Sequence, residues 1–426
     1  MTHWFLAAST DWNHFREYAR VCLLTLASIL STTVAAVGQQ GPPIRELGSP
    51  TAVSRGSLAS VAAVVEVTAG HVYVNDITAH RLLLYDSSLA NAVVIADSAG
   101  TNGENYGDRP ATLLSFRADS ALLITPAALS MLVLSPQGRV TRTMAMPPVA
   151  SDVPALTGSI FGTPGFDGRG RMLYFAPVRF AFQLRPDGGP QTFEPADSAL
   201  LVRFDLSART LDTVGAIRIP KTRSTVEPRV EPEAPRRSVT AFPPGMVDDW
   251  AVTADGRLAI VRGRDYHVDW LDSGDVWHST ARMPYAWERL DDEQKAALID
   301  SAAAALQARI DSVVASILRG PTVRGRGARS IVAPSASRAP VADVPDYRPP
   351  FGQGAVRADL DGNIWIRMNR TLDGRTVYDV VGPKGELVDR VRFPPFRQLA
   401  GFGPGVVYVG VRDSTGVAHV ERVRTR

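Results

Sequence analysis

The stretch DGNIWI at residues 361–366, followed by YDVV at 378–381 and GPKG at 382–385, contains two apolar runs with turn-forming residues beside them. Runs rich in β-branched and aromatic residues, bounded by Asp, Gly and Pro, are typical of strands joined by tight turns. We therefore predict two paired strands here. A single twisted sheet cannot cover both of its faces, whereas sheets stacked radially bury their faces against one another.

The same couplet of apolar runs recurs along the chain. Its equivalent positions lie between 43 and 105 residues apart and are Tyr73, Leu123, Tyr174, Ile260, Trp365 and Tyr408. One four-stranded propeller blade takes about 40 to 50 residues, so each interval holds one blade and the two longest hold insertions. Six copies predict an all-β fold, a six-bladed β-propeller with one long inserted α-helix, over residues 45–426.

The pattern resembles that of NHL-type six-bladed propellers, in which an Asp- and Gly-rich turn leads into an apolar strand. The resemblance covers residues 45–426 without the insertions, and it implies a fold rather than a catalytic signature. Seven blades or a two-sheet sandwich would not explain six couplets at blade spacing. Ring closure often requires that the first blade be completed by a strand from the other terminus, and the sequence does not identify that strand.

Composition limits the classes of partner. The 426 residues are 45% hydrophobic and 21% charged, which is ordinary for a globular protein. The 46 basic and 43 acidic residues nearly cancel, and only Lys221, Lys295 and Lys384 are lysines. Because this balance gives no basic stripe, we do not expect a nucleic-acid partner.

Residues 1–38 have the layout of a secretory signal peptide. Arg16 and Arg20 precede an apolar run at 21–37, and small residues follow it. We predict cleavage after Gly38, or alternatively after Ala36, and a periplasmic or extracellular protein; an uncleaved membrane anchor is the alternative. The single cysteine, Cys22, lies inside the apolar run, so the mature chain would have no disulfide, thiolate metal site or cysteine nucleophile.

Two insertions interrupt the pattern. Residues 220–246 are rich in Pro, Glu and Arg and predict a loop. Residues 286–348 predict an amphipathic helix over 291–319, begun by an Asp291–Gln294 capping box, and then a flexible tether. The apolar stripe of this helix is Ile299, Ala302, Leu306, Ile310, Val313 and Ile317. We expect the stripe to pack on the propeller rim or on one ring face, with a lid or a partner-docking helix as alternatives.

The sequence Asp359-Leu360-Asp361-Gly362-Asn363 resembles the start of a calcium loop. An EF-hand loop requires Gly at its sixth position and an acidic residue at its twelfth, whereas here Gly is fourth and Arg370 is twelfth. The pattern therefore favours a hairpin turn. The mature histidines, at positions 71, 80, 267, 278 and 419, include no pair at metal-ligand helical spacing. We predict no cofactor and no local metal site, with a calcium ion as the alternative.

The densest polar and aromatic cluster lies at residues 264–270, shortly after Asp249 and Trp250. Strand alternation places Tyr266, Val268 and Trp270 on one sheet face, with His267 and Asp269 on the other. This pattern predicts a buried core face and a polar face with a cross-strand hydrogen bond. The ligand-binding candidates of the sequence are Asp249, Trp250, Arg264 and His267.

The catalytic residues are unknown, because the chain has no nucleophile elbow, phosphate-binding loop or zinc-protease helix motif. The favoured hypothesis is an exported non-catalytic propeller that binds an unknown protein or small-molecule ligand, with a membrane contact only if the N-terminal segment is uncleaved. The alternative is a metal-dependent propeller hydrolase or lactonase with a composite axial site, for which Glu104, Asn105 and Asn369 are conceivable ligands. That alternative requires several oxygens to converge on the axis, whereas a binding protein needs only an exposed aromatic or charged patch.

Overall fold

The computed structural model describes residues 41–100, 105–117, 119–147, 156, 161–176, 191–227, 236–319 and 333–425. The predicted signal peptide and Glu104 lie outside these residues. The chain separates into a unit of residues 1–41 and a unit of residues 42–426, and every element described below belongs to the second unit. No helix among the described residues is long and apolar enough to cross a membrane.

Most of the chain forms antiparallel sheets of four local strands. Sheet 1 contains β3 (Ala63–Glu66), β4 (Val72–Asp76), β5 (Arg81–Tyr85) and β6 (Ala92–Asp97). Sheet 2 contains β7 (Thr112–Phe116), β8 (Ser120–Thr125), β9 (Ser130–Leu134) and β10 (Val140–Ala145). Sheet 3 contains β11 (Gly165–Phe166), β12 (Met172–Phe175), β14 (Ser198–Phe204) and β15 (Leu211–Arg218).

Three further sheets complete the repeat. Sheet 4 contains β18 (Asp249–Val252), β19 (Leu258–Arg262), β20 (His267–Leu271) and β21 (Trp277–Ser279). Sheet 5 contains β23 (Phe351–Ala358), β24 (Ile364–Met368), β25 (Val377–Val381) and β26 (Leu387–Arg392), with β1 (Ile44–Glu46) parallel to β26. Sheet 6 contains β27 (Arg397–Gly403), β28 (Val406–Arg412), β29 (Ala418–Arg424) and β2 (Pro50–Val53).

One channel is lined by the innermost strand of each of these six sheets. These strands are β3, β7, β11, β18, β23 and β27. Neighbouring innermost strands contact one another, as β3 contacts both β7 and β27. Apolar side chains fill the space between neighbouring sheets; Tyr266 and Val268 of sheet 4, for example, pack with Phe351 and Ile366 of sheet 5. This arrangement is a β-propeller, so the predicted fold class, an all-β propeller with one long inserted helix, is confirmed.

Hairpin turns with an Asp or Ser at the first position connect many of the strands. In the turn at Asp359, one carboxylate oxygen accepts hydrogen bonds from the N–H groups of Asp361 (3.0 Å) and Asn363 (2.8 Å). Gly362 has a φ of +80°, a conformation that favours glycine. The same pattern of backbone bonds recurs at Asp86, Asp167, Asp272 and Asp413. The prediction that Asp359 begins a hairpin turn is therefore confirmed.

The ring closes at sheet 6, where the N-terminal strand β2 pairs with β29. This differs from the expectation that the first blade would be completed from the other terminus. Sheet 1 already has four consecutive strands, whereas the chain after sheet 5 supplies only three. The N-terminal strand therefore covers the edge of β29 that would otherwise be unpaired.

Where the structure describes them, parts of the two insertions form strands in place of the loop and the tether that the sequence predicts. They contribute β16 (Arg223–Val226), β17 (Arg237–Ala241) and β22 (Ser335–Arg338), which join β13 (Gln191–Phe193) in a seventh sheet, here called the outer sheet. Each strand is short and polar, and β17 pairs with β22 about a hundred residues away, so local periodicity does not indicate the outer sheet. The hydrogen bonds of pairing nevertheless satisfy its backbone groups.

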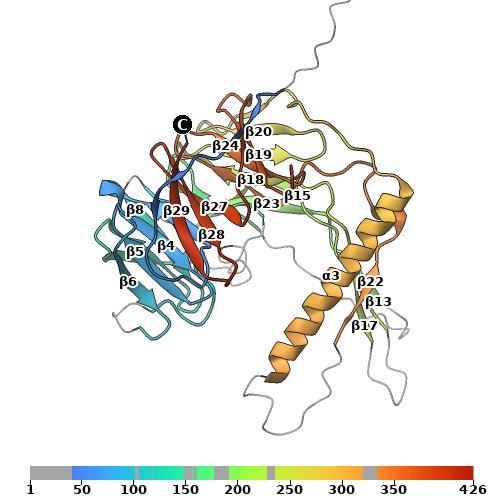
Figure 1. Cartoon of the computed structure of the whole chain (residues 1–426), viewed down its shortest axis with the longest axis horizontal. Coiled ribbons are helices and arrows are strands. Elements are labelled where there is room, and N and C mark those ends of the chain that lie inside the picture. Colours follow the sequence, from blue (N-terminus) through green and yellow to red (C-terminus); the bar gives the residue numbers. More distant parts are fainter. Residues whose placement is uncertain are drawn as a thin grey trace, which may run out of the picture. The chain divides into compact units, whose positions relative to one another are not determined.

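The helix α3 (Asp292–Arg319) packs on β22 and β17 of the outer sheet, and Figure 1 shows it beside both strands. The expectation that it packs on the propeller rim or a ring face is therefore wrong. Its capping box is present, because Asp291 accepts from the N–H of Gln294 at 2.8 Å and the Gln294 side chain accepts from the N–H of Asp291 at 3.0 Å. The apolar stripe is buried at Ile299 but exposed at Val313 and Ile317.

Candidate functional site

The central channel has a volume of about 970 Å³, within the range of small-molecule sites. Its walls are formed mostly by apolar side chains and by the hydroxyls of Ser and Thr residues. Among the residues that the structure describes, four charged ones line it: Glu66, Arg117, Arg357 and Asp359. The availability of these four groups decides what the channel can bind.

The two carboxylates of the channel are already engaged. Glu66 accepts a hydrogen bond from the Tyr408 hydroxyl at 2.7 Å. Asp359 accepts from the backbone of its turn and also from the side-chain N–H groups of Asn363 (2.8 Å) and Trp365 (3.0 Å). Across the part of the chain that the structure describes, no three His, Cys, Asp or Glu side chains come together. Because the oxygens of Asp359 are held by N–H donors, this turn does not fit a calcium ion.

Arg357 differs from these acids because most of its donors are unused. Its Nη1 donates to the carbonyl oxygens of Val356 (2.9 Å) and Gly354 (3.5 Å). Nε and Nη2 have no hydrogen-bond partner among the described residues. Burial lowers the pKa of this guanidinium, and the nearby charge of Asp249 opposes that shift. The channel therefore contains a half-buried guanidinium with free donors.

Asp249 lies in the wall beside Arg357, at the start of β18, and is fully buried. Its Oδ2 accepts a hydrogen bond from the N–H of Val356 in β23 at 2.8 Å. Burial raises the pKa of Asp249 to about 6, while the hydrogen bonds from backbone N–H groups and the charge of Arg357 oppose the rise. A carboxyl group in this range changes its charge under mildly acidic conditions.

Trp250, the next residue, is also fully buried. Gly162 packs directly against its indole, and a Cβ at this glycine would lie 2.4 Å from the Trp250 Nε1. The structure therefore places Asp249 and Trp250 in an innermost strand and its packing, and not on a loop that could carry recognition at a ring face. Asp249 does not line the channel and affects it only through neighbouring residues. Trp250 packs behind the channel wall.

His267 belongs to a polar network on the surface of sheet 4. Its ring nitrogens lie 3.2 Å from the carboxylates of Asp265 and Asp269. Asp269 also bonds to Arg262 across the strand pair, at 2.6 Å. The opposite face of β20 is buried at Val268 and Trp270. The predicted division into a core face and a polar face with a cross-strand bond is confirmed.

Arg264 is exposed and lines a different cavity of about 750 Å³. Trp287 and Tyr347 line the same cavity. Of the four sequence candidates, the structure brings only Asp249 and Trp250 together, and it places Arg264 and His267 elsewhere on sheet 4. Arg357 was missed; its signal in the sequence is a charged residue inside the apolar strand FGQGAVRA.

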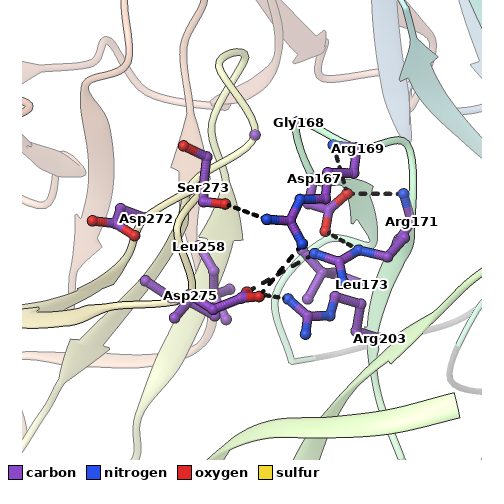
Figure 2. Close-up of a pocket in the computed structure, with 12 residues that line it drawn as sticks. Asp167, Gly168, Arg169, Arg171, Leu173, Arg203, Leu258, Asp272, Ser273 and Asp275 are labelled. Carbon is purple, nitrogen blue, oxygen red and sulfur yellow. Dashed lines mark hydrogen bonds and ion pairs between the residues drawn. The ribbon is translucent and has the colours of Figure 1, made fainter.

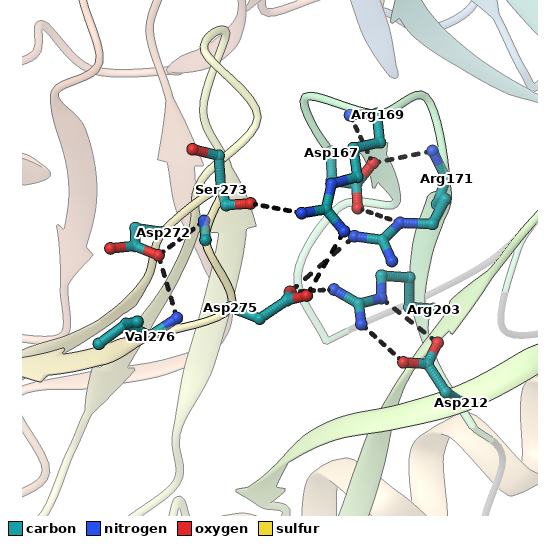
Figure 3. Close-up of polar contacts among 10 residues, drawn as sticks. Asp167, Arg169, Arg171, Arg203, Asp212, Asp272, Ser273, Asp275 and Val276 are labelled. Carbon is teal, nitrogen blue, oxygen red and sulfur yellow. Dashed lines mark hydrogen bonds and ion pairs between the residues drawn. The ribbon is translucent and has the colours of Figure 1, made fainter.

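A third group of charged residues connects sheets 3 and 4, as Figures 2 and 3 show. Arg203 pairs with Asp212 at 2.7 Å and with Asp275, and Asp275 also lies within ion-pair distance of Arg169 (3.7 Å) and Arg171 (3.9 Å). The cavity among them has a volume of only about 20 Å³. This space accommodates little more than one water molecule, so the cluster connects two sheets rather than binding a ligand.

No family model matches the chain, and no curated protein matches it either. Several solved structures are similar to it at low identity. A gluconolactonase from Xanthomonas campestris is 7% identical with a TM-score of 0.37, covering 91% of this chain and 99% of its own. A virginiamycin B lyase from Staphylococcus aureus is 8% identical with a TM-score of 0.36, covering 86% and 96%. Regucalcin from Agrobacterium tumefaciens, a calcium-binding protein, is 10% identical with a TM-score of 0.35, covering 90% and 98%. At these values no activity or ligand is transferred to this chain.

Proposed function

We propose that this chain is an exported, NHL-like six-bladed propeller that binds a small organic anion in its central channel, with Arg357 as the anchor. The observation that carries the proposal is the guanidinium of Arg357, which lines the channel while its Nε and Nη2 have no partner in the part of the chain that the structure describes. A guanidinium binds a carboxylate or a phosphate through two parallel N–H···O bonds.

The surroundings of Arg357 support this ligand class. The two channel acids are hydrogen-bonded to other groups: Glu66 accepts from the Tyr408 hydroxyl, and Asp359 accepts from backbone N–H groups of its own turn. Thr112 and Thr163 also line the channel and supply hydroxyl groups for a polar ligand. An anion that pairs with Arg357 away from bulk water gains more Coulomb energy than it would at an exposed site.

Metal-dependent hydrolysis is the alternative that the sequence left open. It requires several carboxylate or amide oxygens on the axis. The described channel offers only carboxylates that are already hydrogen-bonded, and Asn75 is held by Tyr106 (2.6 Å) and the Ala111 carbonyl (2.9 Å). Binding is therefore the better supported function, and the assay below also detects turnover.

The test uses the mature protein and a panel of small carboxylates and sugar phosphates. Binding is measured by calorimetry, and each bound compound is recovered and examined for chemical change. We expect at least one anion to bind saturably and to lose about 10- to 100-fold in affinity in Arg357→Gln, which is the usual contribution of a hydrogen bond to a charged group. Arg55→Gln is the matched control, because Arg55 is exposed and does not line the channel.

An equal affinity in Arg357→Gln and Arg55→Gln would contradict the proposal. Conversion of the bound compound would show that the channel catalyses a reaction in addition to binding. A gain in affinity on adding calcium, lost again with a chelator, would favour the metal-dependent alternative.

A further inference from the structure

A second cavity, here called the groove, shares no lining residue with the channel. It has a volume of about 750 Å³ and lies where the chain passes between sheets 3 and 4 and the outer sheet. Its walls come from residues 218–221, 242–247 and 342–347, together with Asp197, Arg264 and Trp287. The sequence singled out Arg264, but the proposed channel function does not use it.

Aromatic rings form one part of the groove. Trp287 and Tyr347 are 37% and 44% exposed, and their ring centroids lie 6.3 Å apart. Tyr285 supports Trp287 from the side at a centroid distance of 5.0 Å. Two large exposed rings that meet inside a concave surface differ from scattered apolar residues, and such aromatic surfaces mark binding sites. The two ring planes are nearly perpendicular, at 81°, so the pair offers a ligand ring the face of one ring and the edge of the other.

Unpaired arginines form the second part. Arg218 and Arg264 are exposed, and no side-chain partner of either is found among the described residues. Two acids of the groove lining already form ion pairs. Asp343 pairs with Lys221 (3.0 Å) and Arg223 (3.2 Å), and Asp346 pairs with Lys295 (2.6 Å). Asp197 is the remaining acid of the lining without a described side-chain partner. The free charge of the groove is therefore positive.

We infer that the groove is a second binding site, which takes an organic anion that carries a flat ring, such as an aromatic carboxylate. The ring would lie against Trp287 and Tyr347, and the acidic group would pair with Arg264. The groove volume falls within the range of small-molecule pockets. A neutral amide analogue would keep the ring contact and lose the charge-assisted hydrogen bond. Comparing the acid with its amide therefore distinguishes the contribution of the arginine from that of the aromatic rings.

The experiment measures calorimetric affinities of the full mature protein for indole-3-acetate, 4-hydroxyphenylacetate and benzoate, each beside its uncharged amide. We expect at least one acid to bind at least 10-fold more tightly than its amide, and we expect Arg264→Gln to remove that preference. Arg357→Gln in the channel should preserve it, which distinguishes this site from the channel. Arg55→Gln is the matched surface control.

Trp287→Leu should weaken both the acid and the amide, and its far-ultraviolet circular dichroism and melting temperature report whether it folds. Arg264→Gln removes an exposed side chain, so the test does not depend on the aromatic variant. Equal affinities for acid and amide, or an unchanged preference in Arg264→Gln, would overturn the inference. Absence of saturable binding of all three acids at millimolar concentration would overturn it as well.

Discussion

The carboxylate of Asp249 accepts a hydrogen bond from the backbone N–H of Val356 at 2.8 Å, and this bond joins the innermost strands of two neighbouring sheets. Strands of different sheets share no hydrogen-bonded ladder, so the side chain supplies the link that the backbone does not. The link stands directly beside Arg357, the anchor of the proposed anion site. Asp249 is itself a buried ionisable group, and its raised pKa leads to the first prediction.

We predict that the contribution of Asp249 to stability falls as the pH rises from about 4 to about 6. Its pKa is raised to about 6 in the folded protein, so the folded state holds more protons than the unfolded state in this window. The contribution of Asp249 therefore decreases with pH through the window and is constant above it. A shift of about 2 pH units corresponds to about 3 kcal/mol. Urea unfolding of the protein and of Asp249→Asn across this range measures the effect.

Asp249→Asn keeps the shape of the side chain and an acceptor for Val356, but it does not titrate. We expect the stability difference between the variant and the unchanged protein to grow in favour of the variant between pH 4 and 6. A difference that is constant across this window would show that Asp249 titrates normally. Comparing the two proteins cancels the contribution of the other buried acids.

Substitution of Arg203 should destabilise the protein more than substitution of Arg357. Arg203 pairs with Asp212 and Asp275, whose hydrogen bonds and charges raise its pKa. Arg203→Gln leaves Asp212 without this partner and Asp275 with only the longer contacts to Arg169 and Arg171, and it should cost about 1 to 3 kcal/mol. Burial lowers the pKa of Arg357, so Arg357→Gln relieves a desolvation cost and should change stability by less than about 1 kcal/mol. Chemical denaturation of both variants tests the contrast, and a larger loss in Arg357→Gln would assign that residue a structural role.

Tyr266→Phe should destabilise the contact between sheets 4 and 5. The Tyr266 hydroxyl donates to Asp379 at 2.7 Å, and both residues are buried. Burial already raises the pKa of Asp379, and removal of its donor should raise that pKa further. We expect a loss of about 1 to 3 kcal/mol at neutral pH, measured by denaturant unfolding, and a smaller loss at acidic pH. A loss that does not depend on pH would indicate a packing effect alone.

Calcium should leave the melting temperature unchanged. The turn at Asp359 resembles the start of a calcium loop, but its oxygens are bound by Asn363 and Trp365 as well as by the turn backbone. Differential scanning calorimetry with calcium and with a chelator checks this expectation. A higher melting temperature in calcium, absent in Asp359→Asn, would show that the turn opens to bind the ion.

The sequence predicted the propeller because its couplets are local. In sheet 5, for example, the apolar residues around Trp365 and Tyr378 alternate over a few residues, and an Asp-Gly turn stands beside them. The outer sheet could not be predicted in this way, since β17 pairs with β22 about a hundred residues away and neither strand is apolar. Short strands of this kind are specified by their partners rather than by their own pattern.

The candidate site was predicted only in part. Asp249 was identified from a local cluster, although its role depends on burial that the sequence does not report. Arg357 was missed because a single arginine in a strand resembles any edge residue until its neighbours are known. A charged residue within an innermost strand could have drawn attention, since such strands have few routes to solvent.

The most direct test of the channel site is the calorimetric affinity of the mature protein for small carboxylates and sugar phosphates, beside Arg357→Gln and Arg55→Gln. The structure predicts saturable binding of at least one anion, a loss of about 10- to 100-fold in Arg357→Gln, and no loss in Arg55→Gln. Binding that is equally strong in all three proteins, or absent from the unchanged protein across the whole panel, would contradict it.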